Sequence, residues 1–529
     1  MTQGEGDAMP EGQGGVTQDA RANTETFRLR SFVESLGEDE LEVIDAPHAL
    51  GELAPGFDGN PKAVLFTCAG PEKAEIVGNV TGSRSRIAKA FGVPEADMLK
   101  EFIRRVSTPQ EVFEVPSAEA PVQAEIWTGD DADLTRLPAP FLHALDGAPY
   151  LSATVDFTRD EARGRTNVGC RRLMLRGRKE AGIDATTPSD LRAIYEAASA
   201  AGQRLPISFI LGCYPTDHVA AAMRMPIDET ELVARMRGAS LPVVKCITND
   251  IRVPADAEYV IEGYLDERGH VEAEGPFGEF LGYYGVMKRN PVFHLTAITK
   301  RRDALFQVAT IGGRDVAMTD TAMLNAVRCE AIVWRALENA IREPVAVHAT
   351  GASGGNFNIR IAMRTRVPGE PRNAIAAAFS CLANLKNVFV VDDDIDIFDD
   401  SQVEWALATR FQASRDLVVE EGFRAIPLDP SLDGARTGSK AGFDLTIPFG
   451  KRDAMEFRIP TPPTYEGARF DSVHAALKDG PKTFEQLMAA VGSRDGRDVV
   501  LALDRIRQAE GLDRDGMGAW VLGRPAERQ

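Results

Sequence analysis

The chain has few of the residues that hold metals or cross-link small domains. Its 529 residues include six cysteines and seven histidines, all scattered, and no Cys-x-x-Cys motif. This pattern argues against a disulfide framework, a zinc site and a histidine metal cage, and it is typical of free thiols in a reducing cytoplasm. No apolar run is long enough to cross a bilayer and no signal peptide is recognisable, so we expect a cytoplasmic protein without a membrane partner.

Positive charge is also scarce. Sixty Lys and Arg residues stand against 79 Asp and Glu residues, which gives a formal net charge of −19. This balance argues against nucleic acid and anionic membranes as partners. The hydrophobic content of 44% is that of an ordinary globular protein, and the length predicts two to four domains.

The order of the expected helices and strands divides the chain into five parts. Residues 1–23 have almost nothing to bury and predict a disordered tail, whereas residues 24–119 read as an α/β domain. Residues 120–315 hold many short strands and few helices, which favours a β-barrel or a sandwich. Residues 316–465 alternate between helices and strands as a second α/β domain, and residues 466–529 show the three helices and hairpin of a winged helix. The near-balanced charge of this last part favours a packing or assembly module over DNA binding.

Two acids flank a tight turn in Glu274-Gly-Pro-Phe-Gly-Glu279. The glycines and proline exclude regular helix, so both carboxylates belong to one short loop. In a confined site two such acids cannot both ionise freely, and one is then able to carry a proton at neutral pH. A nearby arginine would hold the other ionised, and Arg172 is a candidate. Taken alone, the acid loop is better explained as a solvated surface turn, and the Arg172 segment as a surface strand with paired arginines.

Several fragments in a fixed order resemble the UbiD-type decarboxylases, a family that includes ferulic acid decarboxylases and relatives acting on aromatic and heteroaromatic acids. The fragments are Asn167 with Arg172 five residues later, Pro188-Ser-Asp190, Glu229, Val244-Lys-Cys-Ile-Thr-Asn-Asp250, the Glu274–Glu279 loop and Val390-Val-Asp-Asp-Asp-Ile-Asp396. The resemblance spans about residues 26–465. It implies an N-terminal α/β domain, a split β-barrel cofactor domain of the flavin reductase type and a C-terminal α/β oligomerisation domain.

The resemblance also implies a reaction and its residues. The reaction is the reversible, non-oxidative decarboxylation of an aromatic, heteroaromatic or α,β-unsaturated acid, with release of CO2, through a covalent adduct with prenylated FMN. A separate flavin prenyltransferase makes that cofactor. The catalytic set falls on Arg172, Glu274 and Glu279, with Glu279 as the acid that protonates the product carbon and Arg172 with Glu274 as the supporting ion pair. Family members are dimers or dimer-based hexamers, so a homodimer or homohexamer is expected.

A divalent metal, Mn²⁺ or Mg²⁺, is implied at Asn167, Asp190 and Glu229. Asp190 stands where the family carries histidine, a departure that still supplies a hard oxygen ligand. A K⁺ ion is implied near Val168, Ala222, Met225 and Glu229. The residues expected to contact the cofactor are Asn167, Val168, Arg172, Ser189, Met225, Glu229 and Lys440.

The substrate pocket is less sharply defined. Its expected lining is Met323, Leu324, Asn325, Phe443, Leu445 and Thr446. Leu281 stands where ferulic-type enzymes tend to carry histidine, so that substrate preference is not transferred. Lys440 as a phosphate partner competes with the interpretation of an exposed loop lysine. Two other functions stay open: a plain FMN-dependent oxidoreductase on a split barrel, and a non-catalytic assembly protein that retains the fold.

Overall fold

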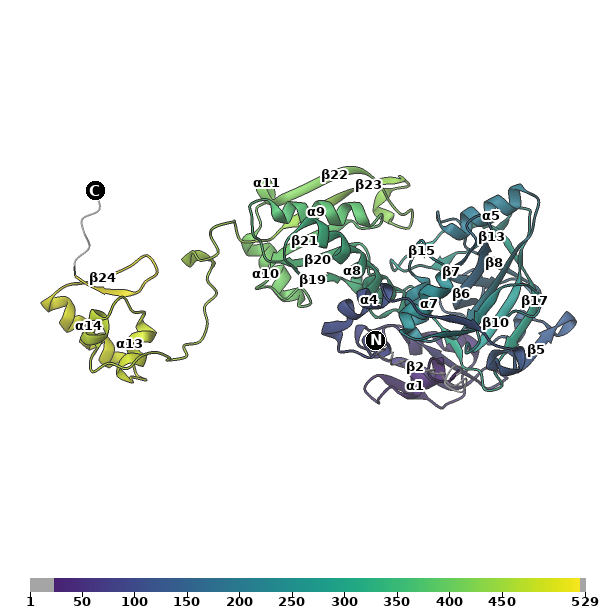
Figure 1. The fold of residues 1–529 in the computed structure, drawn as a ribbon, viewed down its shortest axis with the longest axis horizontal. Helices are drawn as coiled ribbons and strands as arrows, with labels where there is room; N and C mark the ends of the chain where they lie inside the picture. Colours follow the sequence, from purple (N-terminus) through teal and green to yellow (C-terminus); the bar gives the residue numbers. More distant parts are fainter. Residues whose placement is uncertain (1–22, 524–529) are drawn as a thin grey trace, which may run out of the picture. The chain divides into compact units, whose positions relative to one another are not determined.

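The computed structural model describes residues 23–523 and shows a mixed α/β protein (Figure 1). The expected disordered tail lies outside the described residues, except for its last position. The chain separates into a large compact unit, residues 1–446, and a small one, residues 447–529. Among the helices of the described part, none combines the length and the apolar composition that crossing a bilayer requires.

The central domain is a closed barrel of six antiparallel strands. The order is β12-β9-β6-β7-β8-β17, and β17 pairs back onto β12. The barrel strands are β6 (Tyr150–Asp160), β7 (Arg165–Leu175), β8 (Glu180–Ile183), β9 (Leu205–Leu211), β12 (Tyr259–Leu265) and β17 (Val292–Lys300). The short strand β5 (Glu125–Thr128) adds to β17 outside the ring. The barrel expectation is confirmed, and the alternative of a sandwich is wrong because the ring closes.

Alternation along the strands explains which side chains fill the barrel. Leu173 of β7 and Phe209 of β9 belong to one hydrophobic core, whereas Val168 and Ile210 of the same strands belong to a second. Successive side chains of a strand face opposite sides, so each strand serves both cores. The second core includes residues of the helices α6 (Pro215–Ala221), α7 (Glu229–Arg237) and α8 (Asp320–Ala340).

The N-terminal domain is completed by a strand from far along the chain. Its sheet has the order β1-β2-β3-β18, and β18 (Phe306–Val308) follows the last barrel strand. The remaining elements are β1 (Leu41–Ile44), β2 (Ala63–Ala69), β3 (Ala74–Gly78), α1 (Leu29–Glu34), α3 (Arg84–Phe91) and α4 (Met98–Val106). Asp320, the first residue of α8, accepts hydrogen bonds from the backbone of Thr81 at 2.6 Å and of Thr310 at 2.8 Å. The buried Asp320 carboxylate thus connects the N-terminal domain with the segment after β18 and with α8.

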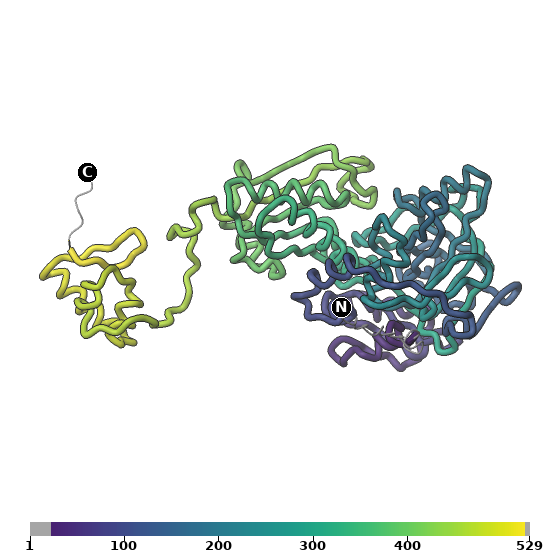
Figure 2. The backbone as a smooth tube through the Cα atoms, viewed as in Figure 1, coloured from purple at the N-terminus to yellow at the C-terminus, as the bar shows by residue number. Residues whose placement is uncertain are grey.

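The C-terminal domain is a five-stranded mixed sheet with helices on both faces (Figures 1 and 2). The strand order is β19-β20-β21-β23-β22. Helices α8 and α9 pack against Ile361 and Val390, whereas α10 packs against Ala362 and Val391, which face the other way. The elements are α9 (Glu370–Cys381), α10 (Asp400–Arg410), β19 (Pro344–Ala349), β20 (Asn358–Met363), β21 (Asn387–Asp392), β22 (Leu417–Arg424) and β23 (Thr437–Asp444).

The small C-terminal unit has three helices followed by a hairpin, the order expected from the sequence. Its elements are α12 (Val473–Lys478), α13 (Phe484–Val491), α14 (Arg497–Ala509), β24 (Leu512–Arg514) and β25 (Trp520–Leu522). Leu487, Leu503 and Trp520 are buried in a core of its own. The unit therefore has the internal packing of a separate module.

A buried ion triad fixes α6 and α7 against the barrel. Arg237 at the end of α7 donates to both oxygens of Asp217, at 2.8 and 2.6 Å, and to both oxygens of Asp256, at 2.6 and 3.0 Å. All three side chains are 1% exposed. Every N–H of the Arg237 guanidinium that faces these acids donates a hydrogen bond to them, so the buried charges are compensated without water.

We expect Arg237→Leu to lower the free energy of unfolding by about 3–5 kcal/mol, because it leaves two buried carboxylates without their cation. Chemical denaturation measures the change. Lys245→Met is the matched control, since it removes a surface pair with Asp250 and should cost less than about 1 kcal/mol. Equal effects of the two substitutions would contradict the structural role of the triad.

Candidate active site

The acid loop is held by two short hairpins. β13 (Glu272–Glu274) pairs with β16 (Lys288–Asn290), and β14 (Phe277–Gly278) pairs with β15 (Tyr284–Gly285). The Gly275–Pro276 peptide bond is cis, and Gly275 has φ +93°, a conformation that favours glycine. Glu274 ends β13 fully buried, and Glu279 follows β14 with 7% of its surface exposed. The expectation of a sharp turn presenting two acids is confirmed, and the alternative of a solvated surface turn is wrong.

A second segment supports this loop and was not singled out from the sequence. Asp146 accepts a hydrogen bond from the backbone of Gly278 at 2.9 Å, and Gly147 donates one to Pro276 at 2.9 Å. His143 contacts Asp146 through Nδ1 at 3.0 Å and lies directly over Gly278. A Cβ at Gly278 would lie 2.6 Å from that ring, so only glycine leaves room for it. No local sequence signal links these residues to the acids.

Arg172 lies between the two acids. Its Nε donates to Oε1 of Glu274 at 3.0 Å and its Nη2 to Oε2 of Glu274 at 3.2 Å, while Nη1 donates to Oε1 of Glu279 at 2.7 Å. Nη2 also reaches Asp184, after the end of β8, at 3.2 Å. The structure thus brings together the three residues proposed from the sequence and adds a third carboxylate that sequence reasoning missed.

Burial and charge act against each other in this cluster. Burial alone would lower the pKa of Arg172, but the carboxylates of Glu279, Glu274 and Asp184 outweigh it and raise that pKa. Burial would likewise raise the pKa of Asp184, but Arg172 and Lys288 hold it well below its usual range. The Arg172 guanidinium also lies 4.3 Å from the Phe277 ring centroid, a cation–π contact that needs no water.

The two acids of the loop differ in how fully they are bonded. Both oxygens of Glu274 accept hydrogen bonds from Arg172, and Asn290 adds a weak contact to Oε2 at 3.5 Å. Glu279 accepts one bond, at Oε1, and its Oε2 has no hydrogen-bond donor among residues 23–523. Glu274 is therefore a fixed partner of Arg172, whereas Glu279 retains an oxygen for another group.

A second polar cluster lies where β7 meets α7. Glu229 Oε2 accepts from the Asn167 side chain and from the Val168 backbone, both at 2.7 Å, and Oε1 accepts from the Met225 backbone at 3.4 Å. Burial raises the pKa of Glu229 despite these bonds. The Asn167 Oδ1 is buried and has no hydrogen-bond partner among the residues that the structure describes. Four residues expected to surround the cofactor phosphate or its metal are thus adjacent.

Asp190 is engaged elsewhere in the structure. Its two oxygens accept a bidentate pair from Arg224 at 2.7 and 2.8 Å, while the neighbouring Ser189 caps α5 (Asp190–Ala200) through the Arg192 backbone. Throughout the described residues, no three His, Cys, Asp or Glu side chains converge as a metal cluster. The metal set Asn167, Asp190 and Glu229 stays a prediction.

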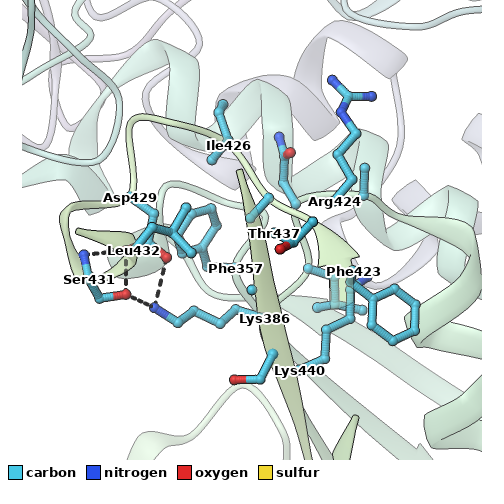
Figure 3. A pocket seen from close by; sticks show the side chains of 16 residues that line it. Phe357, Lys386, Phe423, Arg424, Ile426, Asp429, Ser431, Leu432, Thr437 and Lys440 are labelled. Carbon is cyan, nitrogen blue, oxygen red and sulfur yellow. Dashed lines mark hydrogen bonds and ion pairs between the residues drawn. The ribbon is translucent and has the colours of Figure 1, made fainter. Parts of the chain in front are cut away.

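Lys440 lies in strand β23 and not in an exposed loop. It is 2% exposed, and its Nζ donates to the carbonyls of Phe379 and Leu382 at the end of α9, both at 2.7 Å. It borders a cavity of about 250 Å³ beside Phe423 (Figure 3). Across that cavity Lys386 pairs with Asp429 at 2.8 Å. None of the residues lining this cavity belongs to the Arg172 cluster.

The expected pocket residues separate into two groups. Met323, Leu324 and Asn325 lie on α8, and Asn325 donates to the carbonyl of Gly354 at 3.1 Å. A Cβ on Gly354 would lie 2.8 Å from the ring of Phe280, the residue after Glu279, so this group adjoins the acid loop. The other group is part of the C-terminal domain: Phe443 stacks on Phe389, Leu445 is buried beside α10, and Thr446 bonds to Asp444. Within the described residues none of these three forms a hydrogen bond with the acid loop, and their place in the substrate pocket stays a prediction.

Comparison with known families identifies the chain. Three models of the 3-octaprenyl-4-hydroxybenzoate carboxy-lyase family, UbiD, match in succession: the N-terminal domain over residues 43–106, the Rift-related domain over residues 113–315 and the C-terminal domain over residues 322–445. The chain belongs to the UbiD family. It is accordingly a carboxy-lyase.

Individual UbiD relatives agree. The anhydromevalonate phosphate decarboxylase of Methanosarcina mazei is 32% identical over 81% of this chain and 98% of its own length. The UbiD-class enzyme HmfF from Pelotomaculum thermopropionicum, solved with FMN, is 33% identical with a TM-score of 0.77, over 82% of this chain and 98% of that one. The 3,4-dihydroxybenzoic acid decarboxylase of Klebsiella pneumoniae is 26% identical with a TM-score of 0.74, over 82% and 97%.

Lys440→Met separates a structural role from cofactor binding. We expect it to lower the free energy of unfolding by about 1–3 kcal/mol, because two buried carbonyls lose their donor, and to leave FMN affinity unchanged. Burial lowers the pKa of Lys440 from 10.5 to about 8. The unfolded chain therefore binds more protons between these values, and wild-type stability should rise relative to the variant as pH increases from 8 towards 10.5. Denaturation at several pH values and FMN titration measure both. Weaker FMN binding with unchanged stability would instead support the phosphate-partner prediction.

Proposed function

We propose that this chain catalyses the reversible, non-oxidative decarboxylation of an aromatic, heteroaromatic or α,β-unsaturated carboxylic acid with prenylated FMN as cofactor. The observation that carries the proposal is the buried Arg172 held between Glu274 and Glu279, with one Glu279 oxygen unused. A related dimeric form of HmfF, 31% identical with a TM-score of 0.74, was solved with prenylated FMN. A flavin prenyltransferase would supply the cofactor to a homodimer or homohexamer.

The residues around Asn167 fit a cofactor phosphate bridged by a divalent cation. The buried Asn167 Oδ1 lacks a partner, and Glu229 beside it offers a carboxylate, so two hard oxygen ligands are already adjacent. Asp190 is the third residue of the predicted set, and its carboxylate is paired with Arg224 in the structure. Mn²⁺ or Mg²⁺ would be held by these three residues once Asp190 exchanges Arg224 for the metal. K⁺ would lie near the backbone of Val168, Ala222 and Met225.

The hydrogen bonds of the cluster support separate roles for its acids. Asp184 pairs with Arg172 at 3.2 Å and with Lys288 at 2.8 Å, and both oxygens of Glu274 accept from Arg172. Glu279 is our choice for the acid that protonates the product, because among these three carboxylates only its Oε2 faces no donor in residues 23–523. Arg172 and Glu274 then hold Glu279 in position, and bound prenylated FMN supplies the electron sink for the bond to CO2.

The names of the relatives narrow the class of substrate but do not identify the substrate of this chain. Two curated relatives, at 32% and 26% identity, are named for anhydromevalonate phosphate, whereas solved neighbours at 26–27% identity are named for 3,4-dihydroxybenzoic and vanillic acids. We therefore place a phosphorylated aliphatic acid first in the substrate panel and benzoic acids second. These acids share a conjugated or otherwise unsaturated carbon next to the carboxyl group that is lost.

Two rival functions predict different experimental results. A plain FMN-dependent oxidoreductase would oxidise NAD(P)H and release no CO2. A non-catalytic assembly protein would bind no flavin when produced together with the prenyltransferase. Bound prenylated FMN, seen by absorption and mass spectrometry, with CO2 release from one panel acid, supports the proposal over both.

We expect Glu279→Gln to reduce decarboxylation about 10²- to 10⁴-fold, the usual worth of a positioned general acid, while the flavin remains bound. Deuterium incorporation from D2O into the product measures the proton transfer directly. Glu272→Gln, on the same hairpin but half exposed, is the matched control and should keep full activity. Undiminished deuterium incorporation in the Glu279 variant would refute its assigned role.

We also expect Mn²⁺ to strengthen FMN binding by the apoprotein, and Glu229→Gln to remove about 10-fold or more of that gain. Titration followed by flavin fluorescence, with and without EDTA, gives the affinities. Glu231, on the same helix, pairs within residues 23–523 only with Arg235, so Glu231→Gln should behave as wild type. Identical FMN affinities in Mn²⁺ and EDTA would exclude the metal-bridged arrangement.

A further inference from the structure

Four buried side-chain atoms without a hydrogen-bond partner gather on the barrel, where β6 pairs with β7. Within residues 23–523 they are both oxygens of Asp156, Nε of Arg171 and Oδ1 of Asn167. Asp156 is fully buried, and its Oδ1 lies 3.4 Å from Nε of Arg171. Buried polar groups are normally hydrogen-bonded, so this concentration indicates a place where a polar ligand binds.

Strand pairing puts these groups on one face of the sheet. Asp156 lies opposite Gly169, and Asn167 and Arg171 are the alternate neighbours of that glycine along β7. Alternate residues of a strand point to the same face. A Cβ on Gly169 would lie 3.0 Å from Oδ1 of Asp156 and 3.2 Å from Nη1 of Arg171. The guanidinium therefore folds back over the glycine, in the direction of Asn167.

Arg171 has hydrogen-bond donors to spare. Its Nη1 donates to the Cys170 carbonyl at 2.7 Å, and its Nη2 makes a weak contact with the Ser189 hydroxyl at 3.5 Å. A guanidinium carries five N–H groups, so most of them are uncommitted. Ser189 is the N-cap of α5, and the first N–H groups of a helix, at the positive end of its dipole, have no partner within it. The acid at that end, Asp190, is neutralised by Arg224.

We propose that Arg171 binds the phosphate group of the flavin directly, beside the pair Asn167 and Glu229 to which the metal is assigned. The inference rests on the proposed function, because it takes a flavin mononucleotide as the ligand. A guanidinium suits a phosphate because two of its N–H groups meet two oxygens in one plane. Asp156 is then a positioning residue, since its carboxylate lies beside the guanidinium and keeps it folded over Gly169.

Direct binding predicts a preference for the phosphate that does not need the metal. The test titrates the full-length apoprotein with FMN and with riboflavin, in Mn²⁺ and in EDTA, and follows flavin fluorescence. The variants are Arg171→Gln, Arg171→Lys and the combination of Asp156→Asn with Arg171→Gln. The combination removes both charges, so that no buried carboxylate is left without its cation. Arg178→Gln is the matched control, because Arg178 lies just beyond β7 and pairs with Asp133 at 2.7 Å.

We expect wild type to prefer FMN to riboflavin even in EDTA. Arg171→Gln and the double variant should weaken FMN binding about 10- to 100-fold in both media, as hydrogen bonds between charged groups are lost. Riboflavin affinity should change less than about two-fold. Arg171→Lys should recover part of the loss, since it restores the charge but not the planar fork. Arg178→Gln should bind both flavins as wild type does.

Three results would overturn the inference. An equal loss for FMN and riboflavin would show that Arg171 shapes the barrel and does not meet the phosphate. Unchanged FMN affinity in a double variant of wild-type stability would make the pair purely structural. A loss confined to Mn²⁺ would mean that Arg171 acts only through the metal. Phosphate discrimination that depends on Arg171, in a protein whose prenylated-FMN form releases no CO2, would instead refute the proposed decarboxylation and keep the phosphate contact.

Discussion

The site depends on the burial of one guanidinium among three carboxylates. Arg172 loses its hydration in the folded chain, and only an arrangement that uses nearly all its donors compensates for that loss. The requirement fixes the order of the surrounding elements: β7 supplies the arginine, β8 leads to Asp184, and the cis-proline loop supplies Glu274 and Glu279. A loop free to move would leave the arginine unpaired, which explains the second support from Asp146 beneath Gly278.

Satisfaction of buried polar groups separates structural from functional residues in this molecule. The Arg237 triad and Lys440 use their buried donors within the protein. Within residues 23–523, Glu279, Asn167 and Arg328 each retain an atom without a hydrogen-bond partner. Native proteins leave few such groups, and those they leave are commonly the ones that meet a ligand. The three lie along β7, after β14 and on α8, where the barrel adjoins the C-terminal domain.

Sequence reasoning predicted Arg172, Glu274 and Glu279 together because they stand in motifs that resemble a known family, and it missed the neighbours that are defined only by tertiary contact. Arg172 and the two acids of the loop were expected together, and the barrel was expected from its short strands. Asp184 and His143 reach the cluster across sheet pairings that no local pattern announces. Because β22 and β23 were not recognised as strands, Lys440 was weighed as an exposed loop lysine, whereas the structure buries it in β23. Lys440 as a phosphate partner and Leu445 as a pocket residue stay predictions.

The acid–arginine cluster occupies only some elements of the chain, and this limits what the relatives' names say about the substrate. The acid–arginine cluster is built on the barrel and on a loop paired to itself, and it acts only on the carboxyl group and the carbon beside it. The N-terminal half of α8, with Met323 and Asn325, adjoins this loop through Gly354 and Phe280, and in the described residues it contributes no hydrogen bond to the acid–arginine cluster. One identity score over the whole chain averages both regions, so it says more about the shared reaction than about the substrate.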